Sequence, residues 1–364
     1  MKIKAAVVNK VNGKFDIEDI QLDSEIRSTE VLVKIVATGI CHTDLAIRDQ
    51  FIPFPMPAIL GHEGAGIVEK IGSAVTKVKA GDHVVLSAGS CGECEQCISG
   101  HPSYCSNFMR QNFYGKRIDN SCPYHNHNGK EMGGFFFSQS SFATYSIATQ
   151  ANVVKVEKDV SLEILGPLGC GIQTGAGSVL NIMKPKPGDS LVIYGVGSVG
   201  LSALMAAKVA GCDTIVAVDI HNNRLELAKE MGATHVINSR QNNASEIIRT
   251  EIAIGGMDFS MDTTGRNEII NDAILSLKPK GHCVLAVIGG EKLEVNGMTL
   301  NGKSITYGIE GDSIPDLFIP RLIRLYKKGL FPFDKMIKIY HFDEINQAVE
   351  DSEKGSTIKA VLRI

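Results

Sequence analysis

Four of the nine cysteines of this 364-residue chain lie within residues 91–105, which read CGECEQCISGHPSYC. Four thiolates so close in sequence can complete a tetrahedral zinc site with no open position, which is typical of a structural metal. Iron is an alternative, because sets of four cysteines also hold iron–sulfur clusters and this spacing does not exclude one. Free surface cysteines are a weaker alternative, since such thiols would oxidise readily without a metal. We therefore predict a structural zinc site at Cys91, Cys94, Cys97 and Cys105.

Composition supports metal binding rather than disulfide formation. The chain carries 37 basic and 40 acidic residues, a formal net charge of −3, without a block of like charge, so nucleic acid and anionic membranes are not expected partners. The first residues, MKIKAAVVNK, lack the apolar core of a signal peptide, and no apolar run is long enough to span a membrane. We expect a cytoplasmic protein that acts on small molecules, and clustered cysteines in that compartment more often bind metal.

A second motif, in LVIYGVGSVGLSALMAAKVAG, has G-x-G-x-x-G spacing between an apolar strand and an Ala- and Leu-rich helix. In a dinucleotide site Gly195 permits the tight turn, Gly197 admits the pyrophosphate, and Gly200 lets the helix pack on the strand. The next apolar segment leads to Asp219, where a carboxylate binds the ribose hydroxyls of NAD and repels the 2′-phosphate of NADP. Arg224 opposes this preference slightly, because a nearby arginine can accommodate that phosphate. We predict an NAD site, against the alternative of a merely tight turn.

The elements that must position these motifs change along the chain. Residues 1–171 contain short β-branched runs broken by Gly and Pro, which predict an antiparallel or barrel-like catalytic domain that includes the zinc lobe 91–105. Residues 172–308 alternate apolar strands with helices, which predicts βαβ units in a Rossmann domain with a parallel, doubly wound sheet. Residues 309–364 return to mixed elements and are expected to rejoin the first domain. The predicted fold class is α/β.

A catalytic zinc needs about three protein ligands and one free position. Three candidates are Cys41 in GICHTD, His62 in ILGHEGAG and Cys170 in LGPLGCGIQTG. Each has an ordinary alternative, because Cys is often a small buried apolar residue and a lone His is often only hydrogen-bonded. Spacing cannot join ligands so far apart, so the residue types alone leave this second site open.

Over essentially its whole length the chain resembles the zinc-dependent medium-chain alcohol dehydrogenases. The GHE element from Gly61 continues through Gly66, Gly72 and Val75 as G-H-E-x2-G-x5-G-x2-V, which resembles the family's zinc signature, and the cysteine lobe and GVGSVG follow in the family's order. The segments CHTD, FFSQSSFATY, GPLGCGIQTGAG and FPFDKMIKIYHFDEINQA are most similar to the aryl-alcohol, benzyl-type branch. The resemblance implies a GroES-like β-barrel catalytic domain, two zinc ions per chain and NAD. We also expect a homodimer or homotetramer, since a dinucleotide domain with a free sheet edge often dimerises.

The resemblance also implies roles for single residues. Cys41, His62 and Cys170 match the catalytic zinc ligands. Glu63 matches a carboxylate that can approach the metal, and Thr43 matches the hydroxyl that hydrogen-bonds the substrate oxygen. The other matched positions are Thr174 against the nicotinamide, His42 and Lys359 near the pyrophosphate, and Ser87, Phe136 and Phe137 in a roomy apolar substrate pocket.

The implied function is reversible, NAD-linked oxidation of aromatic or allylic primary alcohols to aldehydes. Zinc would acidify the alcohol, Thr43 would accept its proton, and hydride would pass from the zinc-bound alkoxide to the nicotinamide. Ala46 stands where many members carry the histidine that ends a proton relay. The proton must then leave through the cofactor ribose and water, or through His42 or Arg48. No role is assigned to Cys122, Cys212 and Cys283.

Two other functions stay open at this point. A formaldehyde or glutathione-adduct dehydrogenase on the same scaffold needs cationic pocket residues for the glutathione carboxylates, and the segment near Phe136 supplies none. A catalytically silent nucleotide-binding relative would have kept the fold and lost the chemistry. The joint presence of Thr43 with the three candidate zinc ligands opposes that alternative.

Overall fold

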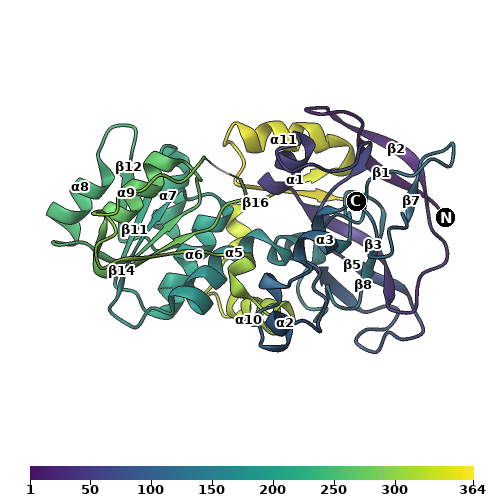
Figure 1. Cartoon of the computed structure of the whole chain (residues 1–364), viewed down its shortest axis with the longest axis horizontal. Helices are drawn as coiled ribbons and strands as arrows, with labels where there is room; N and C mark the ends of the chain where they lie inside the picture. Colours follow the sequence, from purple (N-terminus) through teal and green to yellow (C-terminus); the bar gives the residue numbers. More distant parts are fainter. Residues whose placement is uncertain (290) are drawn as a thin grey trace. The chain divides into compact units, whose positions relative to one another are not determined.

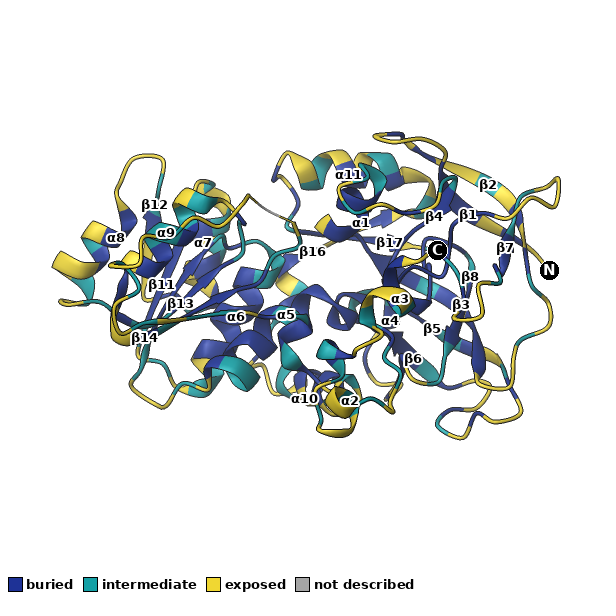
Figure 2. Ribbon diagram, in the orientation of Figure 1, coloured by how far each residue is buried: buried dark blue, intermediate teal, exposed yellow. Residues whose placement is uncertain are grey.

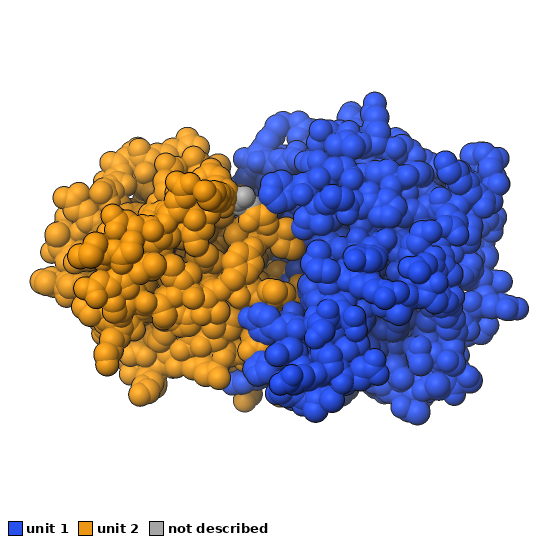
Figure 3. Space-filling view, viewed as in Figure 1, with its two compact units in different colours: residues 1–170, 314–321, 336–364 blue, residues 171–313, 322–335 orange. Residues whose placement is uncertain are grey.

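The computed structural model describes residues 1–289 and 291–364, which form two compact units (Figures 1 and 3). Unit 1 contains residues 1–170, 314–321 and 336–364, and unit 2 contains residues 171–313 and 322–335. Unit 1 is therefore assembled from both ends of the chain. Among the described residues, no helix is both long enough and apolar enough to cross a membrane.

Unit 1 is built on two β-sheets, as its short β-branched runs predict. The order in the smaller sheet is β4 (Ala58–Ile59), β1 (Lys2–Val8), β2 (Phe15–Leu22) and β7 (Tyr124–His125). The order in the larger sheet is β16 (Ile337–His341), β17 (Lys359–Arg363), β3 (Glu30–Gly39), β5 (Glu63–Ile71), β6 (His83–Leu86) and β9 (Val153–Val156). A seventh strand, β8 (Tyr145–Thr149), also pairs with β3, and within this unit only β16 and β17 pair in parallel.

Strand β3 is buried on both faces and is central to unit 1. Val31, Val33 and Ile35 alternate on one face and pack into a core with residues of β5 and β6. Leu32, on the other face, belongs to a second core formed with β1 and β2. Such a strand has little freedom to shift, since a one-residue slip would exchange the two faces. It therefore fixes the chain just before Cys41.

Short helices connect these strands and carry the site residues. In unit 1 they are α1 (His42–Arg48), α2 (Glu95–Ile98), η1 (Pro102–Tyr104), α3 (Phe108–Phe113), η2 (Phe136–Ser138), α4 (Leu162–Leu165), η3 (Gly166–Gly169), η8 (Phe342–Glu344) and α11 (Ile345–Glu353). Helix α10 (Pro315–Lys327) and the turn η7 (Phe333–Met336) include residues of both units. Here η denotes short 3₁₀ or π turns.

Unit 2 contains one parallel sheet whose order is β12 (His235–Asn238), β11 (Thr214–Asp219), β10 (Ser190–Tyr194), β13 (Met257–Asp262), β14 (Leu277–Leu285) and β15 (Ser304–Tyr307). Its helical segments are α5 (Gly171–Gly177), η4 (Ser178–Met183), α6 (Ser198–Ala210), α7 (Asn222–Met231), α8 (Ala244–Ile247), η5 (Ile248–Ile252), α9 (Asn267–Leu275) and η6 (Glu310–Asp312). Strands β10, β11 and β13 are largely buried (Figure 2). Burial on both faces explains the near-continuous apolar sequences of β10 and β11.

The first strand of unit 2, β10, lies between β11 and β13, so the strand order reverses there. Ligands of open α/β sheets bind at the carboxyl ends of the strands beside such a reversal. This topology confirms the predicted α/β class and the Rossmann sheet.

The core of the parallel sheet yields a stability prediction. Ile193 is fully buried in β10, whereas Ile254 is 88% exposed in the same unit. We expect Ile193→Ala to lower the free energy of unfolding by about 2–5 kcal/mol, because it leaves a cavity. The same change at Ile254 should have an effect within about 0.5 kcal/mol. Urea unfolding followed by circular dichroism measures both, and equal effects would contradict this account of the core.

Candidate active site

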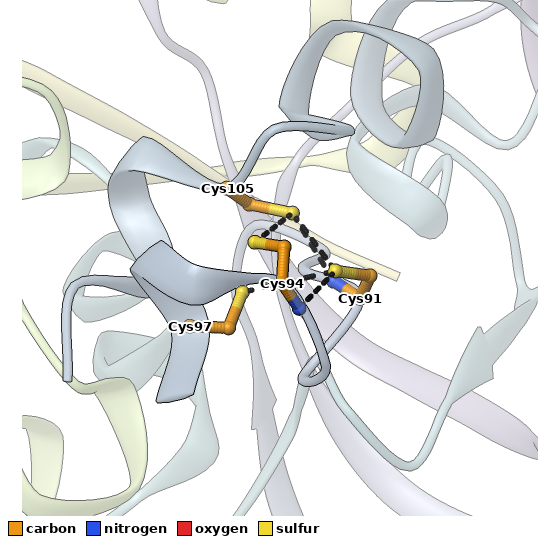
Figure 4. A group of neighbouring side chains, drawn as sticks. All are labelled: Cys91, Cys94, Cys97 and Cys105. Carbon is orange, nitrogen blue, oxygen red and sulfur yellow. Dashed lines mark hydrogen bonds between the residues drawn. The ribbon is translucent and has the colours of Figure 1, made fainter. Parts of the chain in front are cut away.

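The four cysteines of residues 91–105 point their sulfurs toward one another (Figure 4). Cys91 Sγ lies 3.5 Å from Cys105 Sγ and 4.0 Å from Cys97 Sγ, and Cys94 Sγ lies 4.0 Å from Cys105 Sγ. Four sulfurs around one zinc at about 2.3 Å would be about 3.8 Å apart. An iron–sulfur cluster would hold the sulfurs farther apart, because its own atoms occupy the centre. The geometry therefore fits a single zinc ion.

Backbone N–H groups donate to sulfurs of this lobe, and the pKa values of Cys91 and Cys94 are lowered. Cys91 Sγ accepts from the N–H of Cys94 at 3.4 Å, and Cys105 Sγ accepts from the N–H of Asn107 at 3.4 Å. Backbone hydrogen bonds from Ser106 and Cys97 lower the pKa of Cys94 to about 6. The thiolate is the form that binds metal. Burial raises the pKa of Cys97 to about 12 and also raises that of Cys105, so only Cys91 and Cys94 favour this form before an ion binds.

A second group of possible ligand atoms lies in unit 1, where Cys41, His62, Glu63 and Cys170 each have an atom within 4.8 Å of the others. Cys41 is the N-cap of α1, His62 directly precedes β5, and Cys170 directly follows η3. The fold thus joins the three candidate ligands that spacing alone could not join. Two thiolates and an imidazole are a donor set suited to catalytic zinc, with one position left for substrate.

The His62 imidazole is fully buried, and its two nitrogens have different surroundings. Nδ1 lies 2.9 Å from the Oδ1 of Asp44. Nε2 has no hydrogen-bond partner among the residues that the structure describes. A carboxylate at Nδ1 holds the proton there, so the lone pair of Nε2 is available to a metal. A buried nitrogen left without a hydrogen bond is costly, and a bound zinc ion would satisfy it.

Asp44 is a functional residue that the sequence reasoning missed. Its buried carboxylate also accepts from the backbone N–H of Cys41 at 2.9 Å and of Gly61 at 3.0 Å. It therefore fixes the backbone beside two candidate ligands as well as the ring of His62. The available signal was an acidic residue three positions after Cys41, since a metal-binding histidine almost always has such an outer partner.

A buried ion pair lies beside the ligands. The Nζ of Lys359 is 2.7 Å from both oxygens of Glu63 and donates to the carbonyl of Ile40 at 3.0 Å. Burial raises the pKa of Glu63, although the nearby ammonium opposes this. Burial disfavours the ammonium of Lys359, but the charge of Glu63 outweighs it and the pKa of Lys359 is raised. The ammonium of Lys359 is paired with Glu63 here, and its contact with a pyrophosphate stays a prediction.

These charges also act on Cys41. Its hydrogen bond with Cys170 and its interactions with His62 and Lys359 outweigh the effect of burial and hold the pKa of the Cys41 thiol well below its usual value. The thiolate form of Cys41 is therefore favoured more than that of an ordinary cysteine. This is the form that a zinc ligand needs.

Helix α1 carries four other positions considered in the sequence, namely His42, Thr43, Ala46 and Arg48. Thr43 is buried, with its Oγ1 3.6 Å from Cys41 Sγ, so its hydroxyl lies beside the ligand group. His42 is exposed and Ala46 is buried. The guanidinium of Arg48 hydrogen-bonds Asp49 at 2.6 and 2.9 Å, and it donates to Glu353 at 2.9 Å. This engagement opposes a role for Arg48 as a proton carrier.

The predicted pocket residues lie close to the ligand group. The ring of Phe137 stacks on the imidazole of His62 at 4.4 Å, and the ring of Phe136 meets it edge-on at 5.2 Å. The hydroxyl of Ser87 is buried and donates to the carbonyl of Gly169 at 2.8 Å, next to Cys170. Their role in binding a substrate stays a prediction.

The glycine motif of unit 2 joins β10 to α6. Gly195 has a φ of 86°, a conformation that side chains rarely adopt. A Cβ at Gly200 would lie 2.0 Å from the carbonyl oxygen of Gly195, so only glycine permits this packing. A Cβ at Gly197 would meet no atom within 4 Å, so the space beside it is open, as a pyrophosphate requires. The N-terminus of α6 begins at the next residue and favours an anion there.

Asp219 lies at the end of β11, beside a cleft of about 320 Å³ that Gly195, Gly197 and Arg224 also line. Its Oδ2 accepts from the backbone N–H of Val196 at 2.8 Å, which ties it to the glycine loop. The Nη1 of Arg224 lies 3.8 Å from the same oxygen. The cleft therefore suits the adenosine end of a dinucleotide, with a carboxylate fixed at its edge.

Thr174 lies on α5, which packs closely on α6. A Cβ at the neighbouring Gly175 would lie 2.0 Å from the carbonyl oxygen of Val199, so glycine permits this contact. Thr174 is thus held by the helix that begins at the glycine motif. Its contact with a nicotinamide stays a prediction.

Comparison with known proteins extends over both units. The chain matches the family models "Alcohol dehydrogenase GroES-like domain" over residues 27–158 and "Zinc-binding dehydrogenase" over residues 198–319. The crystal structure of benzyl alcohol dehydrogenase from Acinetobacter calcoaceticus is 48% identical, with a TM-score of 0.95, and the match covers 100% of this chain and 99% of that one. An alcohol dehydrogenase zinc-binding domain protein from Burkholderia ambifaria is 45% identical, with a TM-score of 0.97 over 100% and 99% of the two chains. Geraniol dehydrogenase from Castellaniella defragrans is 42% identical over 99% of this chain and 97% of its own.

The two ligand groups predict the metal content. We expect the purified protein to bind two zinc ions per chain, as measured by plasma mass spectrometry. Cys41→Ser should lose the ion held with His62 and keep the ion of the four-cysteine lobe, so its content should fall to about one. Retention of both ions together with full activity in Cys41→Ser would contradict the assignment.

The contacts of Asp44 predict a specific loss of zinc affinity. Asp44→Asn removes the negative charge that orients His62, and losing such an outer partner typically costs about 10–100-fold in metal affinity or activity. Asp49→Asn, at the end of the same helix, is the matched control and should bind zinc as the wild type does. Competition with a zinc chelator measures both. Equal zinc affinities for the two variants would show that Asp44 does not orient the ligand.

Proposed function

Because the chain belongs to the zinc-containing medium-chain alcohol dehydrogenases, we propose that it oxidises aromatic or allylic primary alcohols to aldehydes, reversibly and with NAD. It is an oxidoreductase with zinc-dependent alcohol dehydrogenase activity. The observation that carries the proposal is the convergence of Cys41, His62 and Cys170, with an imidazole nitrogen that has no hydrogen-bond partner among the described residues. Three such donors leave a fourth position on the metal for a substrate oxygen.

The residues around the ligand group would each have a separate role in catalysis. Bound zinc supplies a Lewis acid that polarises the alcohol oxygen, and bound NAD supplies the hydride acceptor. The hydroxyl of Thr43, beside Cys41, would hydrogen-bond the alcohol and accept its proton. Asp44 would keep His62 in the tautomer that binds metal. Lys359 would hold the carboxylate of Glu63 beside the ligands, available to approach the ion during turnover.

The proton must leave the site without a histidine at position 46. Ala46 cannot transfer a proton, and Arg48 is engaged by Asp49 and Glu353. His42 is exposed on the same helix, directly before Thr43. We therefore propose that the proton leaves Thr43 toward solvent, with His42 as the side chain able to assist. An imidazole can both accept and release protons near neutral pH.

The nucleotide cleft supports NAD over NADP. The Oδ1 of Asp219 accepts from the backbone N–H groups of Ile220 and His221 at 2.8 and 2.9 Å, so the carboxylate is fixed where the adenosine ribose would lie. A fixed negative charge there repels a 2′-phosphate. Arg224 could attract a 2′-phosphate, but its guanidinium lies beside the carboxylate of Asp219. The negative charge of Asp219 partly offsets the positive charge of Arg224.

Similarity to benzyl alcohol and geraniol dehydrogenases supports an aromatic or allylic substrate. Loss of hydride from such an alcohol gives a conjugated aldehyde, and the rings of Phe136 and Phe137 provide apolar surroundings beside His62. A glutathione adduct is less favoured, because residues 133–141 read GGFFFSQSS and offer no cation for its carboxylates.

Initial rates of NAD reduction test this proposal. Benzyl alcohol and geraniol should each exceed ethanol in kcat/KM by at least about tenfold, because an apolar pocket gains about 1–3 kcal/mol for each added methylene-sized group. NADP at the same concentration should support a lower rate with each alcohol. If ethanol has the highest kcat/KM, the proposed substrate class is wrong. The absence of turnover with every alcohol would instead favour a catalytically silent protein.

A further inference from the structure

A buried segment, residues 135–142, lies against the backbone around His62 and has an unusual conformation. We call these residues the strap. Phe135, Phe137, Ser138 and Ser140 have φ values of 57°, 51°, 54° and 59°. Residues other than glycine rarely adopt this left-handed region, and several so close together persist only where the surrounding structure imposes them.

The strap approaches residues 60–64 so closely that two of these must be glycine. A Cβ at Gly61 would lie 2.5 Å from the backbone nitrogen of Phe142. A Cβ at Gly64 would lie 2.7 Å from the Cβ of Ser141. The backbone N–H of Ser141 donates to the carbonyl of Gly61 at 2.8 Å. The conformation of the strap and the position of the GHE element therefore depend on each other.

Gln139 makes the central contacts of the strap, with a fully buried side chain. Its Nε2 donates to the carbonyl of His62 at 3.0 Å and to that of Ser87 at 3.3 Å. Its Oε1 accepts from the backbone N–H of Gly64 at 3.2 Å. One carboxamide thus holds the backbone on both sides of Glu63, at His62 and Gly64, and uses its second N–H to tie this segment to Ser87. An apolar side chain would leave these buried groups without that partner.

The backbone of Gln139 is itself anchored. Its carbonyl accepts from the hydroxyl of Tyr124 at 2.8 Å and from the hydroxyl of Ser146 at 2.6 Å. Phe137, two residues earlier, stacks on the imidazole of His62 with an angle of 24° between the rings. The strap therefore touches both the main chain and the ring of His62.

We infer that the strap, through Gln139, positions His62 and Glu63 for the metal. This inference rests on the proposed role of His62 as a zinc ligand. Asp44 fixes a nitrogen of the ring, whereas Gln139 fixes the backbone from which the ring projects. A metal site tolerates displacements of only about 0.5 Å in its ligands, so both constraints are needed. Gln139 acts through His62 and is a positioning residue rather than a catalytic one.

Two variants of Gln139 test this role. Gln139→Met keeps the volume and removes every hydrogen bond of the carboxamide, and Gln139→Glu keeps the shape but places a carboxylate oxygen against two carbonyls. Both should retain the ion of the four-cysteine lobe and lose the second ion to a chelator at least about tenfold faster than the wild type. With Co²⁺ in the second site, the visible bands of both variants should shift. Unchanged bands and an unchanged rate of metal loss would overturn the inference.

Gln150→Met is the matched control. The Oε1 of Gln150 also accepts a backbone N–H, that of Thr76 at 3.3 Å, but this bond lies outside the ligand group. The control should lose metal at the wild-type rate. A wild-type protein with one zinc ion per chain would contradict the proposed metal site itself, whereas two ions with no effect of Gln139→Met would contradict only the positioning role.

A measurement on the wild type covers the case in which neither variant folds. Hydrogen exchange is compared in protein that keeps the second ion and in protein from which a chelator has removed it. Loss of the ion should lower the protection of residues 135–142 and leave α6 unchanged. Equal protection of the strap in the two states would overturn the inference, because the strap would then be independent of the ligand group.

Discussion

The hydrogen bond between Nδ1 of His62 and the carboxylate of Asp44 is the contact on which the metal-ligand group depends. It leaves Nε2 free to face the two cysteine sulfurs, and the same carboxylate holds the backbone of Cys41 and Gly61. A fully buried charge is costly unless its acceptor positions are used. Here three donors use them, so the cost of burial is offset and the geometry of two ligands is fixed together.

The scaffold around this contact leaves few alternative arrangements. Strand β3 is buried on both faces and ends just before Cys41, and its partner β5 begins at Glu63. Gly61 has a φ of 88°, which few other residues would tolerate, and it gives the chain the turn that carries His62. Cys41 and His62 therefore lie beside the ends of paired strands, whereas Cys170 lies between η3 and α5.

Interactions between residues close in sequence could be predicted, and those between distant residues could not. The four-cysteine lobe and the glycine motif each lie within a short segment, and the alternation of strands and helices in unit 2 follows local rules. Cys41, His62 and Cys170 were joined only by resemblance to a family. The aspartate of CHTD, Asp44, could have been recognised as the outer partner of a metal-binding histidine. The residue type of Gln139 gives no indication of its contacts with the backbone around His62. Charge alone could not have paired Lys359 with Glu63, because 296 residues separate them.

That separation has a consequence for how the protein is made. Lys359 belongs to β17, which pairs with β3. Glu63, its partner in the ion pair, is synthesised long before Lys359. Domains usually fold as units during synthesis, the N-terminal one first. Here residues 1–170 cannot bury the carboxylate of Glu63 with its counter-ion until β17 has been synthesised. Most of unit 2 is synthesised between these two segments, so unit 1 can be completed only after it.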